Sequence, residues 1–336
     1  MARRSVSRTT LVPVIAVLLA AAGCGGTTTG GGGGGGGEAE ATTIELAGIP
    51  PFSIPIWPMV VADHQGFYDR ENVDVNITFT FDGGQLLAGG QVDLLSDGAD
   101  SGLIAAARGK DILFVAPHMD TVTDGLMVSP DITSVAELEG TTLRSAGFGT
   151  DEFLARRFIE ESGVDPDTVT FVPIEDDGAA LAQLESGEID GGMFGVGALL
   201  EAEQTGDFNV LGPPEALGTY PWNAIQTTRT FAEANDEAVV GFIRATQDGI
   251  RFIQDPANRD AVIEAVLTTG EGLPQEDVEA SYDSAEGFEQ YSLEPLTPDD
   301  LQPAFEFFEF AGEDVDVESL DLEALIDNSY LERASG

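Results

Sequence analysis

Residues 86–116 read LLAGGQVDLLSDGADSGLIAAARGKDILFVA and contain the pattern that decides the fold class. A turn at Gly90–Asp93 leads into a short apolar strand, which ends in a polar loop at Ser96–Ala99. A helix is expected over Ser101–Ala107, followed by a second apolar strand at Ile112–Val115. Short strands that alternate with apolar-periodic helical segments are typical of α/β proteins.

The same alternation extends along the chain on both sides of this stretch. We expect further strands, rich in β-branched and aromatic residues, at Ile44–Leu46, Val75–Phe81, Leu126–Val128, Thr142–Arg144, Val169–Val172 and Ile225–Thr228. Further helical segments are expected at Gly84–Gly89, Asp151–Glu161, Ala179–Ser186, Gln275–Ser284, Pro298–Ala311 and Leu320–Ile326. Beyond Phe231 the chain is predicted to be mostly helical.

Two helices carry particularly clear signals. The helix from Asp151 has Thr150 as a candidate cap, acidic residues in its first turn, and Gly163 as a stop. A later segment has apolar or small residues at helical spacing, which predicts one buried face: Val239, Phe242, Ile243, Thr246, Ile250 and Ile253.

Length and charge limit the function classes. A chain of 336 residues is longer than one hydrophobic core usually serves, so we expect two lobes. The net charge of -46 repels nucleic acid and anionic membrane surfaces, which excludes nucleic-acid binding. Lys110 is the only lysine and the acidity is spread along the chain, a pattern that predicts a halophilic surface. Molar salt shortens the screening length to roughly 3 Å and so removes most of the self-repulsion.

The N-terminus has the features of an export signal. Arg3, Arg4 and Arg8 precede an apolar stretch at 11–22, which is shorter than the ~20 residues that span a bilayer. Residues 1–23 are therefore predicted to be a cleavable signal peptide. Small residues before Cys24 resemble a lipobox, which implies that this cysteine is lipidated. Ordinary secretion, an uncleaved anchor and twin-arginine export remain alternatives.

Residues 24–42 are predicted to be a tether. Cys24 is the only cysteine, so the chain forms no internal disulfide. The glycine run from Gly30 to Gly37 cannot bury enough surface to fold. As a flexible coil the segment spans on the order of 25 Å. The protein is thus expected on the extracytoplasmic face of the cell membrane, attached through the lipid anchor only.

Several segments resemble, in order and spacing, the substrate-binding proteins of ABC transporters. They are WPMVVADHQGFYDRENVDVNI at 57–77, the stretch at 86–116, SVAELEGTTLRSAGFGTDEFLARRFIEESGVDPDTVTFVPI at 134–174, LESGEIDGGMFG at 184–195, and LTPDDLQPAFEFFEFAGE near the C-terminus. The resemblance is to the NMT1/THI5-like group, which contains sulfonate, taurine, nitrate and thiamine-pyrimidine receptors.

This resemblance implies a periplasmic-binding-protein type II fold, with two α/β lobes joined by two crossover strands and a ligand cleft between them. Lobe 1 would comprise 43–127 plus 223–336 and lobe 2 would comprise 128–222, with Leu126–Val128 and Asn223–Thr228 as the crossings. It further implies a monomer that binds a small-molecule ligand and delivers it to an ABC permease with its ATPase, without a cofactor.

Candidate ligand contacts in lobe 1 follow the ends of the predicted strands. Phe52 and Trp57 could stack on a heterocycle, or they could pack within the lobe. Asp82 is a candidate for a ligand amine or for a helix cap. Ser96 and Asp97 offer a hydroxyl, a carboxylate and backbone amides, although turn formation alone would also explain them.

His118 and the second lobe complete the candidate set. His118 is one of two histidines, and since a metal site needs more convergent ligands, hydrogen bonding in the cleft is favoured and no metal is expected. Backbone amides at a helix N-terminus bind anions favourably. Asp151 and Glu152 would repel an anion there unless their carboxylates point away. The candidates of the second lobe are Phe148, Gly149, Thr150, Asp176, Phe194, Tyr220 and Trp222.

The sequence lacks enzyme signatures. It contains no GxSxG, HExxH or P-loop pattern, and no cysteine follows Cys24, whereas the fungal enzymes that share this domain use a cysteine-rich motif. We therefore expect binding without catalysis. An aromatic and acidic cleft favours a heterocycle of the thiamine-pyrimidine kind as ligand. A sulfonate or nitrate receptor and a ligand-sensing lipoprotein that is not coupled to transport are the alternatives.

Overall fold

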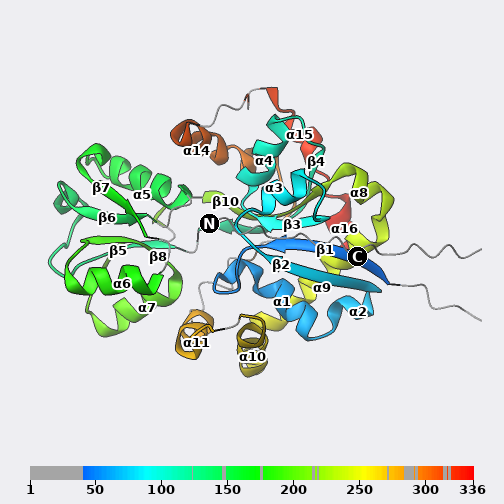
Figure 1. The fold of residues 1–336 in the computed structure, drawn as a ribbon, viewed down its shortest axis with the longest axis horizontal. Helices are drawn as coiled ribbons and strands as arrows, with labels where there is room; N and C mark the ends of the chain where they lie inside the picture. The colour runs from blue at the N-terminus through cyan, green and yellow to red at the C-terminus, as the bar shows by residue number, and fades with distance from the viewer. Residues whose placement is uncertain are drawn as a thin grey trace, which may run out of the picture. The chain divides into compact units, whose positions relative to one another are not determined.

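The computed structural model describes residues 41–122, 124–145, 149–174, 177–213, 216–217, 219–270, 272–283, 291, 294–312, 316 and 319–336. The expected signal peptide, Cys24 and the glycine run lie outside these residues. Residues 39–336 form one compact unit, which contains two five-stranded sheets with helices packed on them (Figure 1). No helix within the described residues combines the length and the apolar character needed to cross a membrane.

The first sheet has the strand order β2-β1-β3-β10-β4. Its members are β1 (Thr42–Gly48), β2 (Val73–Phe79), β3 (Leu94–Asp97), β4 (Ile112–Thr121) and β10 (Thr219–Thr228). β1 is parallel to β2 and β3, whereas β10 is antiparallel to both β3 and β4. The carboxyl ends of β1, β2 and β3 therefore meet at one edge of this sheet.

The second sheet has the strand order β7-β6-β8-β5-β9. Its members are β5 (Gly125–Val128), β6 (Thr142–Ser145), β7 (Thr170–Pro173), β8 (Gly191–Phe194) and β9 (Asn209–Gly212). β6 is parallel to β7 and β8, and β5 is antiparallel to β8 and β9. Both sheets are thus mixed, as the fold class predicts.

The chain passes between the sheets at two places that differ from the predicted crossings. All four residues of β5 pair with β8, so Leu126–Val128 is a strand of the second sheet and the first passage is at 122–124. Asn223–Thr228 pairs with β3 and β4 in the first sheet, and the second passage precedes Thr219. Thr121 and Thr219 are partners, so β4 and β10 remain paired up to the point where both leave the sheet.

The helices are distributed unevenly between the sheets. Those that follow strands of the second sheet are α5 (Thr150–Glu161), α6 (Asp177–Ser186) and α7 (Val196–Thr205). The others are α1 (Trp57–His64), α2 (Phe67–Arg70), α3 (Gly83–Ala88), α4 (Ala99–Ala107), α8 (Arg229–Ala234), α9 (Asp236–Gln254), α10 (Arg259–Thr269), α11 (Gln275–Asp283), α13 (Pro298–Leu301), α14 (Pro303–Ala311), α15 (Leu322–Leu325) and α16 (Ser329–Ser335). Short 3-10 turns lie at Ile54–Ile56, Val135–Leu138, Pro166–Thr168 and Pro256–Asn258.

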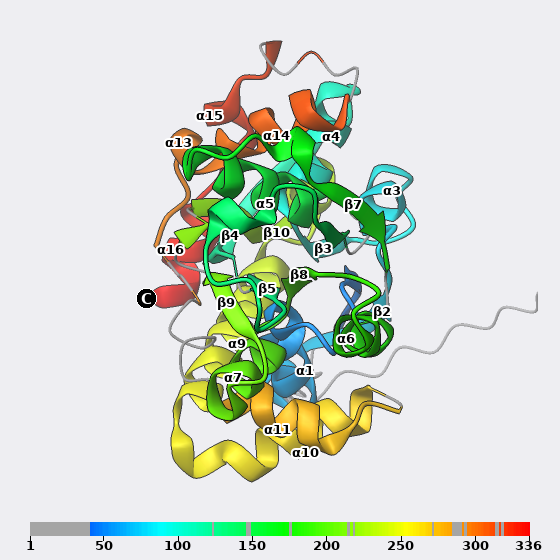
Figure 2. The same ribbon diagram turned by 90° about the vertical axis from the view of Figure 1, so that its left-hand side faces the viewer.

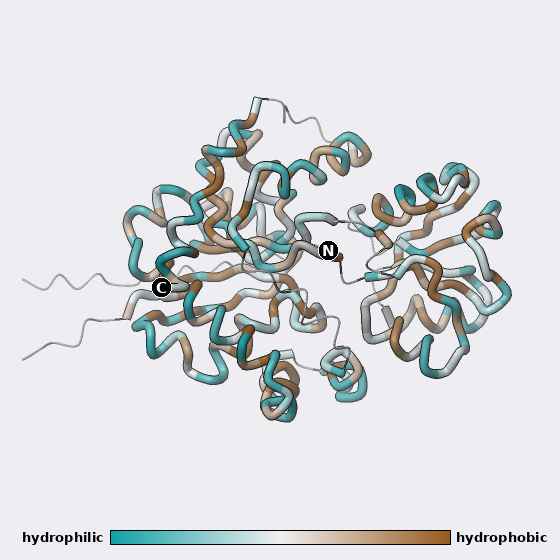
Figure 3. Tube along the Cα trace, turned by 180° about the vertical axis from the view of Figure 1, so that it is seen from behind, coloured by the Kyte–Doolittle hydropathy of each residue, from teal (hydrophilic) through white to brown (hydrophobic). Residues whose placement is uncertain are grey.

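Helix α9 is the central helix of the first core. All six residues predicted for its apolar face are buried, together with α1 residues such as Met59 and Val60. Gly249 permits the close approach of α1, because a Cβ at this position would overlap the carbonyl oxygen of Pro58. Figure 3 shows hydrophobic residues along the strands of both sheets and alternating hydrophilic and hydrophobic stretches along the helices.

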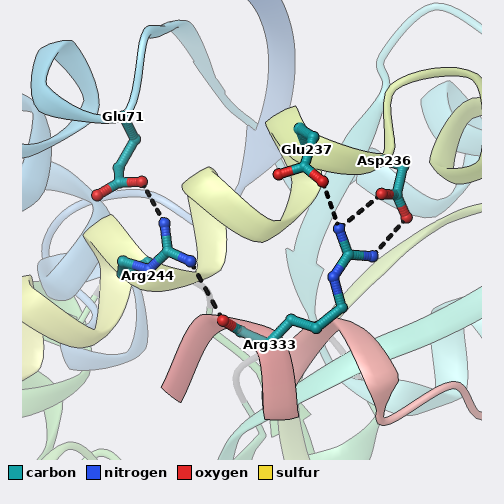
Figure 4. Close-up of polar contacts among 5 residues, drawn as sticks. All are labelled: Glu71, Asp236, Glu237, Arg244 and Arg333. Carbon is teal, nitrogen blue, oxygen red and sulfur yellow. Dashed lines mark hydrogen bonds and ion pairs between the residues drawn. The ribbon is translucent and has the colours of Figure 1, made fainter. Parts of the chain in front are cut away.

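The last helix is held against α9 by Arg244. Its guanidinium bonds Glu71 at 2.5 Å and donates to the carbonyl of Arg333 at 3.1 Å (Figure 4). It also donates to the carbonyl of Ala334 at 3.3 Å. These carbonyls lie in the last turn of α16, where backbone oxygens have no partner within the helix. Arg244 of α9 thus joins the residue that follows α2 to the last turn of α16.

Helices α7 and α11 connect the two halves of the chain. They pack side by side in Figure 2, and a Cβ added at Gly197 of α7 would lie 3.1 Å from the hydroxyl of Ser281 on α11. The segment predicted as one helix at Pro298–Ala311 is divided into α13 and α14 at Gln302. Pro303 explains the break, since a proline inside a helix lacks the amide hydrogen and clashes with the preceding turn.

Candidate ligand-binding site

Two exposed aromatic rings lie where β1 and β2 end. Phe52 and Phe81 are 54% and 48% exposed, and their ring centroids are 6.3 Å apart. Most large apolar side chains of this protein are buried, so a pair of neighbouring exposed rings is a candidate surface for a flat ligand. Phe81 was not among the predicted contacts, because the sequence pattern places it within the strand, whereas β2 ends at Phe79. The Asp82–Gly83–Gly84 turn directly after Phe81 indicates in the sequence that the strand ends before it.

Trp57 lies in the first hydrophobic core and not at the surface where a ligand contact was expected. Its side chain is 1% exposed and belongs to the first core, and its indole Nε1 donates to the carbonyl of Pro51 at 2.9 Å. This placement supports the packing role that the sequence left open and differs from the expectation of a ligand contact. By holding Pro51, Trp57 positions the segment that carries Phe52.

Asp82 is exposed and precedes α3. Its backbone amide donates to the Thr80 hydroxyl at 3.0 Å, and Gln85 donates to its carboxylate at 3.4 Å. It occupies the N-cap position without a side-chain capping bond to the helix. The carboxylate is therefore available at the same edge of the sheet as the aromatic pair.

The turn from β3 into α4 carries two carboxylates, Asp97 at the end of β3 and Asp100 in the first turn of α4, and residues 97–100 are called the acidic loop. Asp97 accepts from the Gly98 amide at 2.9 Å and from the Ser101 hydroxyl at 2.8 Å. Burial raises its pKa to about 6, against the opposing effect of these two bonds. Burial, followed by repulsion from Asp97, raises the pKa of Asp100 to about 7. Near neutral pH the pair therefore favours a partner that supplies a proton or a positive charge.

Asp100 was not among the predicted site residues, although Asp97 was. Ser96, also predicted, is fully buried and donates to the side-chain oxygen of Asn223 at 2.9 Å. The two carboxylates are three residues apart, and the first turn of α4 brings them together. The sequence DGAD at 97–100 has two carboxylates at this spacing before an apolar helix, and this pattern could have predicted that Asp100 lies close to Asp97.

Tyr220 and Thr150 bring the second passage next to this loop. The hydroxyl of Tyr220 lies near Thr150, the first residue of α5. Burial, and then the neighbouring charge of Asp100, raise the pKa of Tyr220 well above its ordinary value, with Arg157 acting in the opposite direction. Residues from β10, α4 and α5, which lie far apart in the sequence, therefore share one site.

Gly149 and the first turn of α5 lie next to Thr150 in this candidate site. The structure places Gly149 rather than Thr150 at the N-cap, with a φ of +83° that favours glycine. A Cβ at Gly149 would lie 3.4 Å from the ring of Phe307 on α14. Glu152 pairs with Arg156 at 2.8 Å along the helix, and Asp151 is buried. The Glu152 carboxylate is thus engaged away from the helix N-terminus.

His118 supports the backbone rather than an open cleft. Its ring is buried and its Nε2 is hydrogen-bonded to the carbonyl of Pro55, which requires the hydrogen on Nε2. Burial lowers its pKa to about 4, so the imidazole is neutral at physiological pH. Tyr291, 5.3 Å away between ring centroids, donates to the carbonyl of Ile54. Both side chains stabilise the 3-10 turn before Trp57, a placement different from the one expected for His118.

The remaining candidates do not add an exposed contact. Phe194 is buried beneath the guanidinium of Arg144, 5.2 Å from its ring centroid. Phe148 and Asp176 lie outside the described residues. Trp222 lies in β10, but the placement of its side chain is not described. In the part of the chain that the structure describes, no three histidine, cysteine or acidic residues are grouped to hold a metal ion.

The sequence profile of the NMT1/THI5 like family matches residues 54–258, which is more than half of the chain. The chain belongs to the NMT1/THI5-like family. This segment includes the strand ends that carry Phe81, Asp82 and the acidic loop. No curated protein sequence matches the chain.

Solved structures share the fold of this NMT1/THI5-like chain. The periplasmic aliphatic sulphonate binding protein SsuA from Escherichia coli has a TM-score of 0.68 at 20% identity, covering 82% of this chain and 96% of that one. The alkanesulfonate-binding protein SsuA from Xanthomonas axonopodis pv. citri, bound to MOPS, has 0.66 at 17%, covering 87% and 100%. The periplasmic nitrate-binding protein NrtA from Synechocystis PCC 6803 has 0.65 at 14%, covering 88% and 89%. The fold is therefore that of the periplasmic binding proteins.

Proposed function

We propose that this protein is the extracytoplasmic solute-binding component of an ABC importer, which captures a small molecule and delivers it to a permease. The family match and the fold support this proposal, since the three structures above are named as sulfonate- or nitrate-binding proteins. The two sheets with their helices would act as lobes that close on the ligand, with β4 and β10 as the hinge. We propose the predicted lobes at 43–127 plus 223–336 and at 128–222, with their boundaries moved to the passages at 122–124 and before Thr219.

The ligand that we propose is a heterocycle with an amino group or a positive charge, of the thiamine-pyrimidine kind. The observation that carries this proposal is the joint presence of Phe52 and Phe81 with Asp97 and Asp100 at one edge of the first sheet. The rings offer a face for stacking, and the carboxylates accept hydrogen bonds or a charge. An anionic ligand would be repelled by the two carboxylates. Their raised pKa values show that negative charge is already unfavourable at this position.

A sulfonate or nitrate is the second candidate. The pairing of Glu152 with Arg156 favours it, because this pairing turns one of the two acidic side chains away from the amides at the start of α5. The buried carboxylate of Asp151 in the same turn opposes it.

The test is thermal unfolding of residues 39–336 in molar salt with a 4-aminopyrimidine, thiamine, riboflavin, taurine, nitrate and bicarbonate in turn. A ligand at 100 times its dissociation constant stabilises the protein by roughly 2.7 kcal/mol. A response to the 4-aminopyrimidine or thiamine supports the proposed ligand class. A response to taurine or nitrate alone contradicts this class and supports the sulfonate or nitrate receptor.

The lipid anchor at Cys24 is a separate part of the proposal. Lipidation would hold the protein on the extracytoplasmic face of the membrane, with the glycine-rich segment as a tether. A Cys24→Ser variant expressed in the native cell should appear in the soluble fraction, whereas the unchanged protein should sediment with membranes. Sedimentation of both proteins would indicate an uncleaved anchor, and solubility of both would indicate ordinary secretion.

Transport can be distinguished from ligand sensing and from catalysis. Deletion of the protein should abolish uptake of its ligand if it serves a permease with its ATPase, whereas deletion of a sensor should change only a downstream response. The ligand recovered from the protein should be chemically unchanged, since we propose binding without bond chemistry. The purified protein should elute as a monomer. We also propose that its acidic surface is an adaptation to high salt.

A further inference from the structure

Three buried polar side chains of β10 hold β3 and its acidic loop. Asn223, Gln226 and Thr227 are each at most 3% exposed, and β10 is the antiparallel neighbour of β3. Asn223 accepts from the Ser96 hydroxyl at 2.9 Å, and Thr227 donates to the carbonyl of Asp93 at 2.7 Å. These bonds lie near opposite ends of β3. Polar groups so deeply buried are costly unless they are bonded, which indicates that the arrangement is specific.

Gln226 makes the contacts closest to the carboxylates. Its amide nitrogen donates to the carbonyls of Asp97 and Gly98, at 3.0 and 2.9 Å. Both hydrogens of the amide are used, and the reverse orientation would put its oxygen against two carbonyl oxygens, so the orientation of the side chain is determined. The amide oxygen points toward α4, where a Cβ at Gly102 would overlap it. Gly102 therefore makes room for Gln226.

The acidic loop is consequently held from both sides. Behind it, Gln226 binds the two carbonyls, and within it the carboxylate of Asp97 binds the Gly98 amide and the Ser101 hydroxyl. Asp100 lies in the first turn of α4, at the end of this loop, so the loop determines where its carboxylate lies. Side chains whose surroundings are fixed in this way keep their direction when a ligand approaches.

We propose that Gln226 is a positioning residue of the ligand site: its two hydrogen bonds to the Asp97 and Gly98 carbonyls set the direction of the Asp97 and Asp100 carboxylates and thereby the preference for cationic over anionic ligands. The part about ligands rests on the proposed function, whereas the part about the carboxylates does not. β10 would then act both as a hinge strand and as the support of the site.

The first experiment needs no ligand. Carboxyl carbons of aspartate are followed by NMR titration of residues 39–336, with Asp97→Asn and Asp100→Asn to assign the signals. Gln226→Met keeps the length of the side chain and removes both donors, so the midpoint of Asp100 should fall from about 7 toward its ordinary value by about one unit or more. Thr227→Val is the matched control, because it removes one buried bond to the other end of β3 and should leave the midpoint unchanged. Equal midpoints in Gln226→Met and the unchanged protein would overturn the proposal.

The second experiment measures selectivity with thiamine as the cationic probe and nitrate as the anionic probe. The preference for thiamine should decrease by about tenfold in Gln226→Met and remain in Thr227→Val. An unaltered preference in a folded Gln226→Met protein contradicts the proposal. If the unchanged protein binds neither probe, the ligand class of the proposed function fails, and the titration still decides whether Gln226 positions the carboxylates.

Gly102→Ala provides a second route if Gln226→Met does not fold. The added methyl group displaces the Gln226 side chain without removing its donors, and the same shift of the Asp100 midpoint is expected. An Asp100 midpoint that stays near its original value in Gly102→Ala counts against the proposal.

Discussion

Arg333 binds both carboxylate oxygens of Asp236, at 2.7 and 2.6 Å, and so joins the last helix of the chain to the start of α9. The same guanidinium reaches Glu237 at 2.8 Å (Figure 4). A paired cation is valuable in a chain that has 60 acidic and only 14 basic residues.

Arg333→Ala should lower the unfolding free energy measurably in dilute buffer, because it removes a bidentate pair and one of the few positive charges. The loss should shrink in molar salt, where screening weakens exposed pairs. Chemical unfolding at low and high salt measures both values. Arg251→Ala is the control, since it removes the same charge but pairs with Asp248 on its own helix only, and its effect should be smaller. Equal effects of the two variants would show that the link to the C-terminus is unimportant.

Trp57 and Phe52 should behave oppositely when replaced by alanine. Trp57→Ala should cost about 3–5 kcal/mol of unfolding free energy, because the side chain is fully packed in the first core. Phe52→Ala should change the unfolding free energy by less than about 0.5 kcal/mol, since the ring is exposed. It should weaken the ligand found in the thermal panel by about threefold to tenfold. Calorimetric unfolding measures the stability of both variants, and a binding titration measures their ligand affinity. Unchanged affinity in Phe52→Ala would show that this ring does not contact the ligand.

The carboxylates of the acidic loop should make stability depend on pH. Asp97 and Asp100 have pKa values of about 6 and about 7 in the folded state, above their ordinary range. The folded protein therefore holds more protons than the unfolded chain, so the stabilisation is present below about pH 4 and is lost as the pH rises toward 7. Asp100→Asn should flatten the fall of unfolding free energy, measured between about pH 5 and pH 7.

Asp236→Asn is the control for this titration. Its hydrogen bonds to Arg333 lower the pKa of Asp236, so this carboxylate is ionised throughout the tested window in both states. The slope of stability against pH should remain that of the unchanged protein. An Asp100→Asn protein with the original slope would contradict the assigned role of Asp100.

Gly249→Ala should be strongly destabilising, by about 1–3 kcal/mol, because its methyl group would overlap the carbonyl oxygen of Pro58. Alanine normally favours a helix over glycine by about 1 kcal/mol, so a loss of stability would be specific to this contact. Gly241→Ala on the same helix meets the Cβ of Glu71 at 3.0 Å and should be milder. Chemical unfolding of the two variants tests the order, and a stabilised Gly249→Ala protein would show that α1 moves to accommodate it.

The amino-acid sequence by itself determined the α/β class, the apolar face of α9 and the end of α5 near Gly163. These features depend on residues close together in the chain, through the periodicity of apolar side chains and the conformational preference of glycine. β8 and β9 were not predicted. β8 contains Gly191 and Gly192, whose lack of side chains hides the strand pattern and admits the neighbouring residues Met127 and Arg144.

Only the tertiary structure decided which strand-end residues form the candidate site. Trp57 follows β1 and Phe194 ends β8, whereas β4 continues past His118 to Thr121. Packing from distant segments buries all three side chains. Phe81 stays exposed and Asp100 joins Asp97, because the local ends of β2 and α4 leave them at the edge of the sheet. The proximity of Tyr220 to Thr150 and of Gln226 to Asp97 depends on the path of β10 through the first sheet. Burial and long-range pairing are properties of the assembled core, and no local pattern specifies them.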